Sequence, residues 1–204
     1  EILNEPRDNM DSKWNEVFPE AIATIRQGTE FRNDNNKNRV IMVGTTNWGT
    51  IYGLEGENAL KLPENDDRLI VTIHYYNPLS FTHQGAEWVN PMYPVGLRWN
   101  DTQKERDAVT ADFKKIRAFS QKNNNVPIHI GEFGVHEKAD IDSRLLWTNH
   151  VARTIESYGF SFAYWHLASS IYNTSKGYYP YLPDALLTYN MPAKAAEIKF
   201  LDEK

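Results

Sequence analysis

The chain contains no cysteine, which excludes disulfide bonds, thiolate metal sites and thiol nucleophiles together. No stretch approaches the roughly 18 consecutive apolar residues of a membrane span, so we expect no transmembrane helix and no membrane partner. No block of lysine or arginine stands out, and the formal net charge is −5. Because a nucleic-acid partner requires a basic face, we expect no binding to nucleic acid. The sequence opens on Glu-Ile-Leu-Asn, so any export signal must lie upstream or be absent.

Aromatic residues, by contrast, are abundant: 6 tryptophans, 11 tyrosines and 9 phenylalanines make up 13% of the 204 residues. Several lie in polar segments rich in glycine and proline, among them Trp48, Trp88 and the tyrosines of 177–181. Exposed aromatic faces suit flat apolar ligands such as the C–H face of a sugar ring, although packing within surface loops explains any single one equally well. The rest of the composition is that of an ordinary globular protein, and we expect a single domain over residues 1–204.

Short apolar runs alternate with longer helical patterns along the chain, which is typical of βα units around a parallel sheet. The sequence therefore predicts an α/β fold. We predict five strands, at residues 2–3, 39–43, 69–73, 128–130 and 160–164. Helices are predicted at 14–27, 102–122, 143–158 and 193–201, with a weaker candidate at 55–60.

Polar and aromatic side chains gather where the predicted strands end. In (β/α)8 barrels that end of the strands carries the active site, with catalytic groups drawn from several strands. The candidates, in chain order, are Asn4 and Glu5, Asn47 and Trp48, His74 and Tyr76, Glu132, and Trp165.

Two of these candidates, Glu5 and Glu132, provide the pair of carboxyl groups that glycoside hydrolysis requires. One carboxyl group must give its proton to the leaving oxygen, and the other must be ionised to attack the anomeric carbon. Pro6 restricts the backbone after Glu5, and the glycines at 131 and 134 let a sugar approach Glu132. A single glutamate at a strand end more often forms an ion pair or caps a helix, so the hypothesis depends on finding both.

Five segments together resemble the cellulases of glycoside hydrolase family 5, in matching order and comparable spacing. Asn-Glu-Pro alone is moderately specific, whereas the ordered set is strong. The segments are Asn4-Glu5-Pro6, His74-Tyr75-Tyr76, Phe81-Thr82-His83-Gln84-Gly85-Ala86-Glu87-Trp88, Gly131-Glu132-Phe133-Gly134 and Trp165.

This resemblance implies roles for most of the candidate residues. Glu5 would be the acid/base and Glu132 the nucleophile of a reaction that retains the anomeric configuration, with the two carboxyl groups about 5–5.5 Å apart. The other implied roles are binding of the sugar 2-hydroxyl by Asn4, contact of His74 with Glu5, support of Glu132 by Tyr76, and sugar binding by Trp165, Trp48 and Trp88.

The resemblance covers only strands four to eight of the family's barrel. A barrel of this kind typically takes ~250 residues and eight strands, so five strands cannot close it. We expect another segment, another chain or a second copy to supply the N-terminal half of the barrel. The alternative is an open or repacked half-barrel, which could be a dimer. His166 is a further departure, because the family more often has an acidic residue there.

The sequence thus predicts a retaining endo-β-1,4-glucanase that acts on cellulose or a related β-glucan without a cofactor or metal. Xyloglucan, mixed-linkage glucan and mannan are alternative substrates. An extracellular or periplasmic location is expected. A carbohydrate-binding remnant that has kept its aromatic platforms but lost turnover is the alternative function, and a structural α/β domain with accidental carboxylates is a third.

Overall fold

The computed structural model describes residues 1–27, 36–64, 66–166, 171–173, 177–178 and 181–188. The chain divides into two compact units. Unit 1 comprises Glu1–His74 and Lys114–Gly131, and unit 2 comprises Tyr75–Phe113 and Glu132–Lys204. The main sheet has the order β1-β2-β3-β4. Its strands are β1 (Ile41–Gly44), β2 (Leu69–Tyr75), β3 (Ile128–Phe133) and β4 (Ser161–Phe162).

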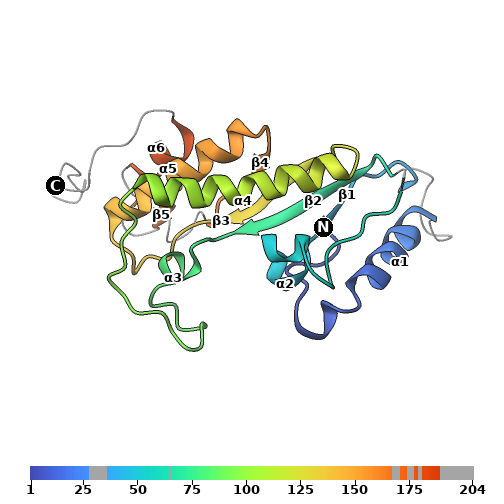
Figure 1. Cartoon of the computed structure of the whole chain (residues 1–204), viewed down its shortest axis with the longest axis horizontal. Coiled ribbons are helices and arrows are strands. Elements are labelled where there is room, and N and C mark those ends of the chain that lie inside the picture. Colours follow the sequence, from blue (N-terminus) through green and yellow to red (C-terminus); the bar gives the residue numbers. More distant parts are fainter. Residues whose placement is uncertain (28–35, 65, 167–170, 174–176, 179–180, 189–204) are drawn as a thin grey trace. The chain divides into compact units, whose positions relative to one another are not determined.

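Unit 1 is built on the parallel pair β1 and β2, in which Ile41 pairs with Leu69 and Gly44 with Thr72. Helix α1 (Trp14–Gln27) runs beside these strands (Figure 1). It buries Trp14, Phe18 and Ile22, which are spaced by four residues and therefore lie on one face. The Trp14 indole also donates a 2.8 Å hydrogen bond to the carbonyl of Gly44. This bond fixes the carboxyl end of β1, where the loop that carries Trp48 begins.

The two long helices that follow begin at side chains that satisfy their free backbone N–H groups. At the start of α4 (Gln103–Lys122), Thr102 and Glu105 each accept a hydrogen bond from the other's backbone N–H, which is a capping box. Helix α5 (Ile141–Ser157) is capped by Asp140, whose carboxylate accepts from the Ser143 N–H at 3.1 Å. This cap explains why α5 begins two residues before the predicted start.

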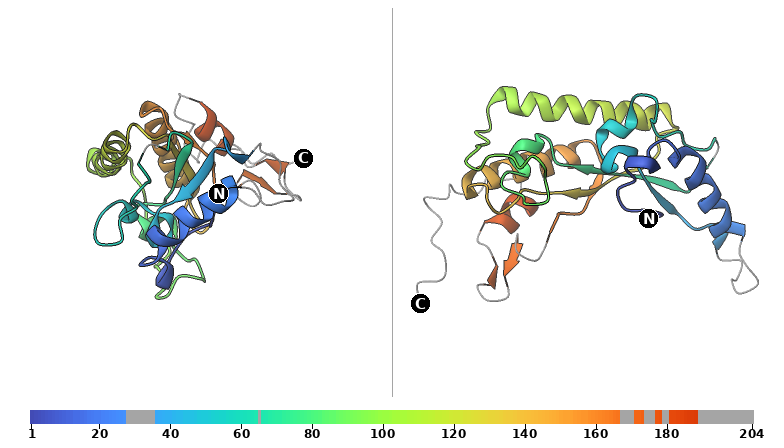
Figure 2. Two further views of the ribbon diagram at one scale, coloured as in Figure 1. Left: turned by 90° about the vertical axis from the view of Figure 1, so that its right-hand side faces the viewer. Right: turned by 90° about the horizontal axis from the view of Figure 1, so that it is seen from below.

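Unit 2 contains α5 and the elements packed around it, with the fully buried Trp147 at its centre. The described residues add α3 (Leu79–Thr82), the antiparallel pair β5 (Tyr172–Asn173) and β6 (Gly177–Tyr178), and α6 (Leu182–Leu187). Helix α6 lies against α5, as Figure 2 shows, and Asn149 donates to the carbonyl of Ala185 at 3.0 Å. No helix in the described parts of either unit is long and apolar enough to cross a membrane.

The structure agrees with the predicted helices at 14–27, 102–122 and 143–158 to within two residues. The other predicted strands appear with shifted ends, and β2 and β3 extend two and three residues further than predicted. The predicted strand at 2–3 is wrong, because that segment makes a single ladder-type bond, from Ile2 N to Met42 O at 3.2 Å. The candidate helix at 55–60 is also wrong, and a short 3-10 helix, Ile51–Leu54, precedes it instead. The helix predicted at 193–201 lies outside the described residues.

Candidate active site

In unit 1, Glu5 is held by His74. The Nδ1 atom of His74 lies 2.9 Å from Oε1 of Glu5, and the His74 side chain is only 3% exposed. Glu5 adopts a left-handed backbone conformation, with φ of 49°. A neutral imidazole can donate or accept at Nδ1 according to its tautomer, so this hydrogen bond can form with either protonation state of Glu5. The pair thus suits a carboxyl group that gains and loses a proton.

Glycine at position 49 brings the loop after β1 against the His74 ring. A Cβ atom at Gly49 would lie 3.4 Å from the ring, and the φ of +67° is one that side chains other than glycine rarely adopt. Asn47 and Trp48 share this left-handed conformation, with φ of 55° and 62°. Such strained positions persist only where the surroundings fix them, and here the Trp48 N–H donates to the carbonyl of Pro6 at 3.0 Å.

Trp48 is 45% exposed, and the Arg7 guanidinium lies 3.8 Å from the centre of its ring. One face of this predicted sugar platform is therefore stacked with a cation. Asn4, predicted to bind the 2-hydroxyl, is exposed directly before Glu5.

Strand β3 passes close to His74 through Gly131 and His129. A Cβ atom at Gly131 would lie 2.3 Å from Oγ1 of Thr72 and 3.5 Å from the His74 ring, so only glycine fits there. Burial, and then the charge of His74, lower the pKa of His129 below its ordinary value. Burial of His129 thus disfavours its charged form.

In unit 2, Glu132 is held by Tyr76. The phenol of Tyr76 donates a 2.8 Å hydrogen bond to Oε2 of Glu132. Tyr76 directly follows β2, and Glu132 is the next-to-last residue of β3. A hydrogen bond donated to the ionised form of a carboxyl group stabilises that form. The arrangement suits a carboxylate that must remain charged.

Trp165 lies beside the end of β3, because its backbone N–H donates to the carbonyl of Phe133 at 2.8 Å. A Cβ atom at Gly134 would lie 2.1 Å from the Trp165 carbonyl oxygen, so the close approach requires glycine. The Trp165 side chain is 54% exposed, and its peptide bond to His166 is cis. Burial raises the pKa of the neighbouring Tyr164 phenol, which therefore stays neutral.

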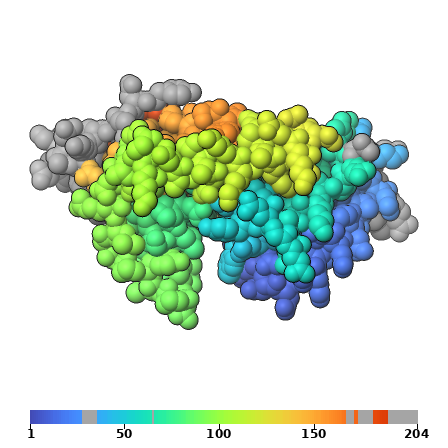
Figure 3. Space-filling view, viewed as in Figure 1, coloured from blue at the N-terminus to red at the C-terminus, as the bar shows by residue number. Residues whose placement is uncertain are grey.

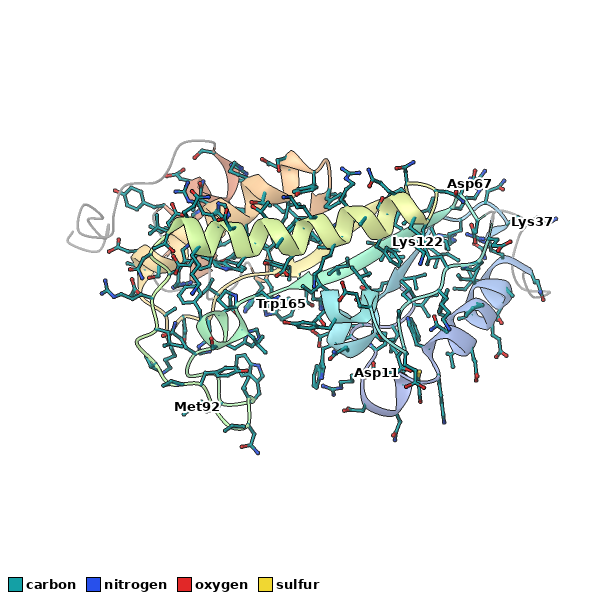
Figure 4. The ribbon with its side chains drawn as sticks, viewed as in Figure 1. Asp11, Lys37, Asp67, Met92, Lys122 and Trp165 are labelled. Carbon is teal, nitrogen blue, oxygen red and sulfur yellow. The ribbon has the colours of Figure 1, made fainter. Side chains whose placement is uncertain are left out.

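Trp88 lies on the loop between α3 and α4, which stands out as the green lobe of unit 2 in Figure 3. Met92, labelled in Figure 4, is 57% exposed on this loop, and Trp88 is 71% exposed. Trp88 packs edge-on against His83 and His136, with ring centres 6.4 Å and 5.2 Å away. His83 in turn packs edge-on against Tyr76 at 4.8 Å.

This ring series connects the exposed Trp88 to the residue that holds Glu132. Sequence reasoning missed His83 and His136 as members of it. His83 could have been found from its place between His74-Tyr75-Tyr76 and Trp88, but no sequence signal marked His136.

Unit 1 and unit 2 thus each hold one carboxylate beside a hydrogen-bonding partner and at least one exposed tryptophan. A carboxyl group whose partner adapts to its protonation and a carboxylate whose partner stabilises its charge are the two components that acid/base-assisted glycosyl transfer uses.

Comparison with known proteins agrees with these features. The family model of the cellulases (glycosyl hydrolase family 5) matches residues 1–170. Endoglucanase H of Acetivibrio thermocellus is 27% identical over 99% of this chain, which corresponds to 19% of that protein. Structures of Thermotoga maritima Cel5A in complex with cellobiose and with mannotriose are 38% identical, each with a TM-score of 0.80.

In both Cel5A structures the match covers 91% of this chain and 58% of the Cel5A chain. The chain therefore spans little more than half the length of Cel5A and about a fifth of endoglucanase H. The sheet and its helices form part of the (β/α)8 barrel of these endoglucanases, as the sequence predicted. With most of its length matched by the family model, the chain belongs to glycosyl hydrolase family 5, the cellulases.

Proposed function

We propose that this protein is a retaining endo-β-1,4-glucanase in which Glu5 is the acid/base and Glu132 the nucleophile. The proposal is supported by family membership and by relatives that are named endoglucanases. The observation that carries it is the pair of held carboxylates: Glu5 lies 2.9 Å from the ring of His74, and Glu132 lies 2.8 Å from the phenol of Tyr76.

In the first step, a carboxylate oxygen of Glu132 attacks the anomeric carbon while the bond from that carbon to the leaving oxygen breaks. Glu5 gives its proton to the leaving oxygen, which departs as the hydroxyl of the shortened chain. The product on the enzyme is a glycosyl ester of Glu132. The Tyr76 phenol stabilises the charge of Glu132 before attack and becomes its donor again when the ester breaks.

In the second step, a water oxygen attacks the same carbon and the Glu132 carboxylate leaves. Glu5, now ionised, takes the proton of that water and returns to its starting state. His74 can serve both states of Glu5, donating to the carboxylate and accepting from the acid at Nδ1. Two inversions at one carbon leave the anomeric configuration unchanged.

The exposed tryptophans support a polysaccharide substrate. Trp165, Trp48 and Trp88 offer apolar faces to sugar rings, and the resemblance assigns Asn4 to the 2-hydroxyl. Cellulose or a related β-glucan is the proposed substrate, with mannan as the alternative because a relative was crystallised with mannotriose as well as cellobiose. Because such polymers lie outside cells, we place the enzyme in the extracellular or periplasmic space.

A second segment or chain belongs to this proposal. The main sheet of the described residues has four strands, whereas a (β/α)8 barrel closes with eight. We propose that an N-terminal barrel half, from the same gene product, another chain or a second copy, supplies the remainder. Mixing the chain with a separately produced N-terminal half of a relative should raise its activity on glucan.

The test has three readouts on the same preparation. Reducing sugar should be released from carboxymethylcellulose and lichenan, and NMR should show the β-anomer as the first product. A 2-deoxy-2-fluoro-cellobioside with a good leaving group should add one glycosyl mass to the peptide that contains Glu132. Binding of cello-oligosaccharide without any hydrolysis, with or without an added barrel half, would replace this proposal by the carbohydrate-binding remnant. An α-anomer as first product would overturn the double displacement.

A further inference from the structure

The segment Tyr75–Asn77 is held by hydrogen bonds to unit 2 residues of three different helices. Asp112 of α4 accepts hydrogen bonds on both sides of Tyr76. Thr82 of α3 donates to the carbonyl of Tyr76 itself at 2.6 Å. Trp147 of α5 donates through its indole N–H to the carbonyl of Asn77 at 3.0 Å. Hydrogen bonds to α3, α4 and α5 therefore hold this segment, in addition to its connection to β2.

Asp112 is the one charged group among these three. Its Oδ2 atom accepts from the Tyr75 phenol at 3.1 Å and from the Asn77 side-chain amide at 2.9 Å. Tyr75 is 1% exposed, and its ring packs against Phe113, the residue after Asp112, with centres 4.9 Å apart. Because one carboxylate oxygen accepts both bonds, Asp112 ties the side chains on either side of Tyr76 to α4.

Trp147 packs against the neighbours of both Tyr76 and Glu132. The buried ring of Trp147 stacks beneath Tyr75 at 6.4 Å and contacts Phe133, the residue after Glu132, at 6.2 Å. Loss of the Asp112 bonds would release Tyr75 and Asn77, whereas Phe133 would keep its contact with Trp147, so the Tyr76 phenol would shift relative to Glu132. Since the Tyr76–Glu132 bond is 2.8 Å long, a movement of about 1 Å would break it.

We propose that Asp112 is a positioning residue for the reaction. It does not touch substrate, but it clamps both neighbours of Tyr76 and so holds the phenol on the nucleophile Glu132. The inference rests on the proposed function, because it assigns Asp112 a part in the work of that nucleophile. It adds a residue on the outer helix α4 to the machinery of a site formed at strand ends.

The test compares Asp112→Ala with Asp107→Ala in the full protein. Asp107 is a matched control, since it lies on the exposed face of the same helix and bonds only locally, to Gln103. Asp112→Ala should lower kcat roughly tenfold with KM nearly unchanged, because misplacing a catalytic group by a fraction of an ångström costs transition-state stabilisation. The acid limb of the kcat/KM profile should move to higher pH. Asp107→Ala should match the wild type in both.

A double-mutant cycle separates positioning from general stability. If Asp112 acts through the phenol, then Tyr76→Phe with Asp112→Ala should be no slower than Tyr76→Phe alone. Asp112→Asn, whose amide oxygen can still accept both bonds, should recover most of the activity. Full additivity with Tyr76→Phe, or an acid limb that does not move, would overturn the inference. Should Asp112→Ala not fold, Tyr75→Phe takes its place, and an unchanged kcat there would overturn it equally.

A readout that needs no turnover keeps this inference apart from the proposed function. In protein labelled with 13C-glutamate, the side-chain signal of Glu132 can be assigned by its loss in Glu132→Gln. Its titration midpoint should move upward in Asp112→Ala and stay in place in Asp107→Ala. Lack of hydrolysis by the wild type would then count against the enzyme, whereas an unmoved midpoint would count against Asp112.

Discussion

The two units hold their carboxylates in different ways. Glu5 in unit 1 is held by a buried imidazole that can reverse its donor and acceptor roles. Glu132 in unit 2 is held by a phenol that donates to it, and the segment that carries that phenol is hydrogen-bonded to residues of three helices. A group that must exchange a proton benefits from an adaptable partner, whereas a nucleophile benefits from a fixed donor. The partner of each carboxylate thus indicates its proposed role, although the two side chains are of the same type.

The largest expected effect is the loss of activity on replacing either glutamate, and only the loss at Glu5 should depend on the leaving group of the substrate. Glu132→Gln should reduce kcat/KM on the order of 10⁴-fold or more on every substrate, because it removes the attacking atom. Glu5→Gln should cost about 10²–10⁴-fold on cello-oligosaccharides but little in the first step on an aryl cellobioside whose leaving group needs no proton. Steady-state and burst kinetics on both substrates measure this. Glu20→Gln, exposed on α1, is the control. Equal losses on the two substrates would reverse or remove the assigned roles.

The next largest effect is expected from replacing the hydrogen-bonding partners of the two glutamates, Tyr76 and His74, on the same substrates. Tyr76→Phe should lower kcat/KM about 10–100-fold on all substrates, since a hydrogen bond to a charged group contributes about 1.5–3 kcal/mol. His74→Gln keeps a donor near Glu5 but cannot donate and accept at one atom. Its loss in the first step should therefore be confined to substrates whose leaving group must be protonated. A His74→Gln variant with a slower burst phase on the activated aryl substrate as well would contradict the division between the units.

Much of this site was predictable from the sequence, because parallel strands place their carboxyl ends at one edge. The pairs Glu5–His74 and Tyr76–Glu132 were both implied by the resemblance to the family 5 cellulases, and both hydrogen bonds are present. The clamp was not predictable, because Asp112 lies inside an amphipathic helix where an aspartate usually faces solvent. The hydrogen bonds that Asp112 accepts from Tyr75 and Asn77 depend on the tertiary packing of α4 over Tyr75.

The same limit applies to parts of the fold. Helix α1 was predicted to the residue because its apolar spacing determines both its type and its buried face. The strand predicted at 2–3 is absent, because a strand requires a ladder of hydrogen bonds and Ile2 contributes one such bond. The antiparallel strands β5 and β6 have two residues each, which is too short for an alternating pattern to show.

Two of the glycines that allow close approach differ in what a substitution would meet. Gly134→Ala places a Cβ 2.1 Å from a backbone oxygen, so either β3 or Trp165 must move, at a cost of about 3 kcal/mol of unfolding free energy. Gly49→Ala meets the His74 ring only at 3.4 Å, and its cost of about 1–2 kcal/mol comes mainly from its left-handed backbone. Urea unfolding of both variants measures the order. Gly56→Ala is the control for left-handed strain, because nothing lies within 4 Å of its Cβ position. A Gly134 variant as stable as the control would show that Trp165 is not tightly placed.

The smallest effect concerns two histidines, one in each unit, whose pKa values are both lowered by burial. His150 stacks on Trp99, and its buried Nε2 atom has no hydrogen-bond partner among the described residues. Because its pKa is lower in the folded chain, the unfolded chain binds the proton first as the pH falls below about 6.5. Stability is therefore complete above that pH and is lost as the pH falls toward the folded pKa. His150→Gln should flatten the dependence by at most ~1.4 kcal/mol per pH unit, the contribution of one proton. Melting temperatures between pH 8 and pH 5 measure this slope. A loss of packing that is equal at every pH lowers the whole curve and leaves the slope unchanged.

His129→Gln should flatten the curve in the same direction. The charge of His74 makes an added contribution to the pKa of His129 in unit 1, and His150 in unit 2 does not share it. Combining each variant with His74→Gln isolates that contribution. The change in slope caused by His129→Gln should be smaller in the His74→Gln background than in the wild type, whereas the change caused by His150→Gln should be the same in both. An equal reduction for both variants would show that the two units do not titrate separately.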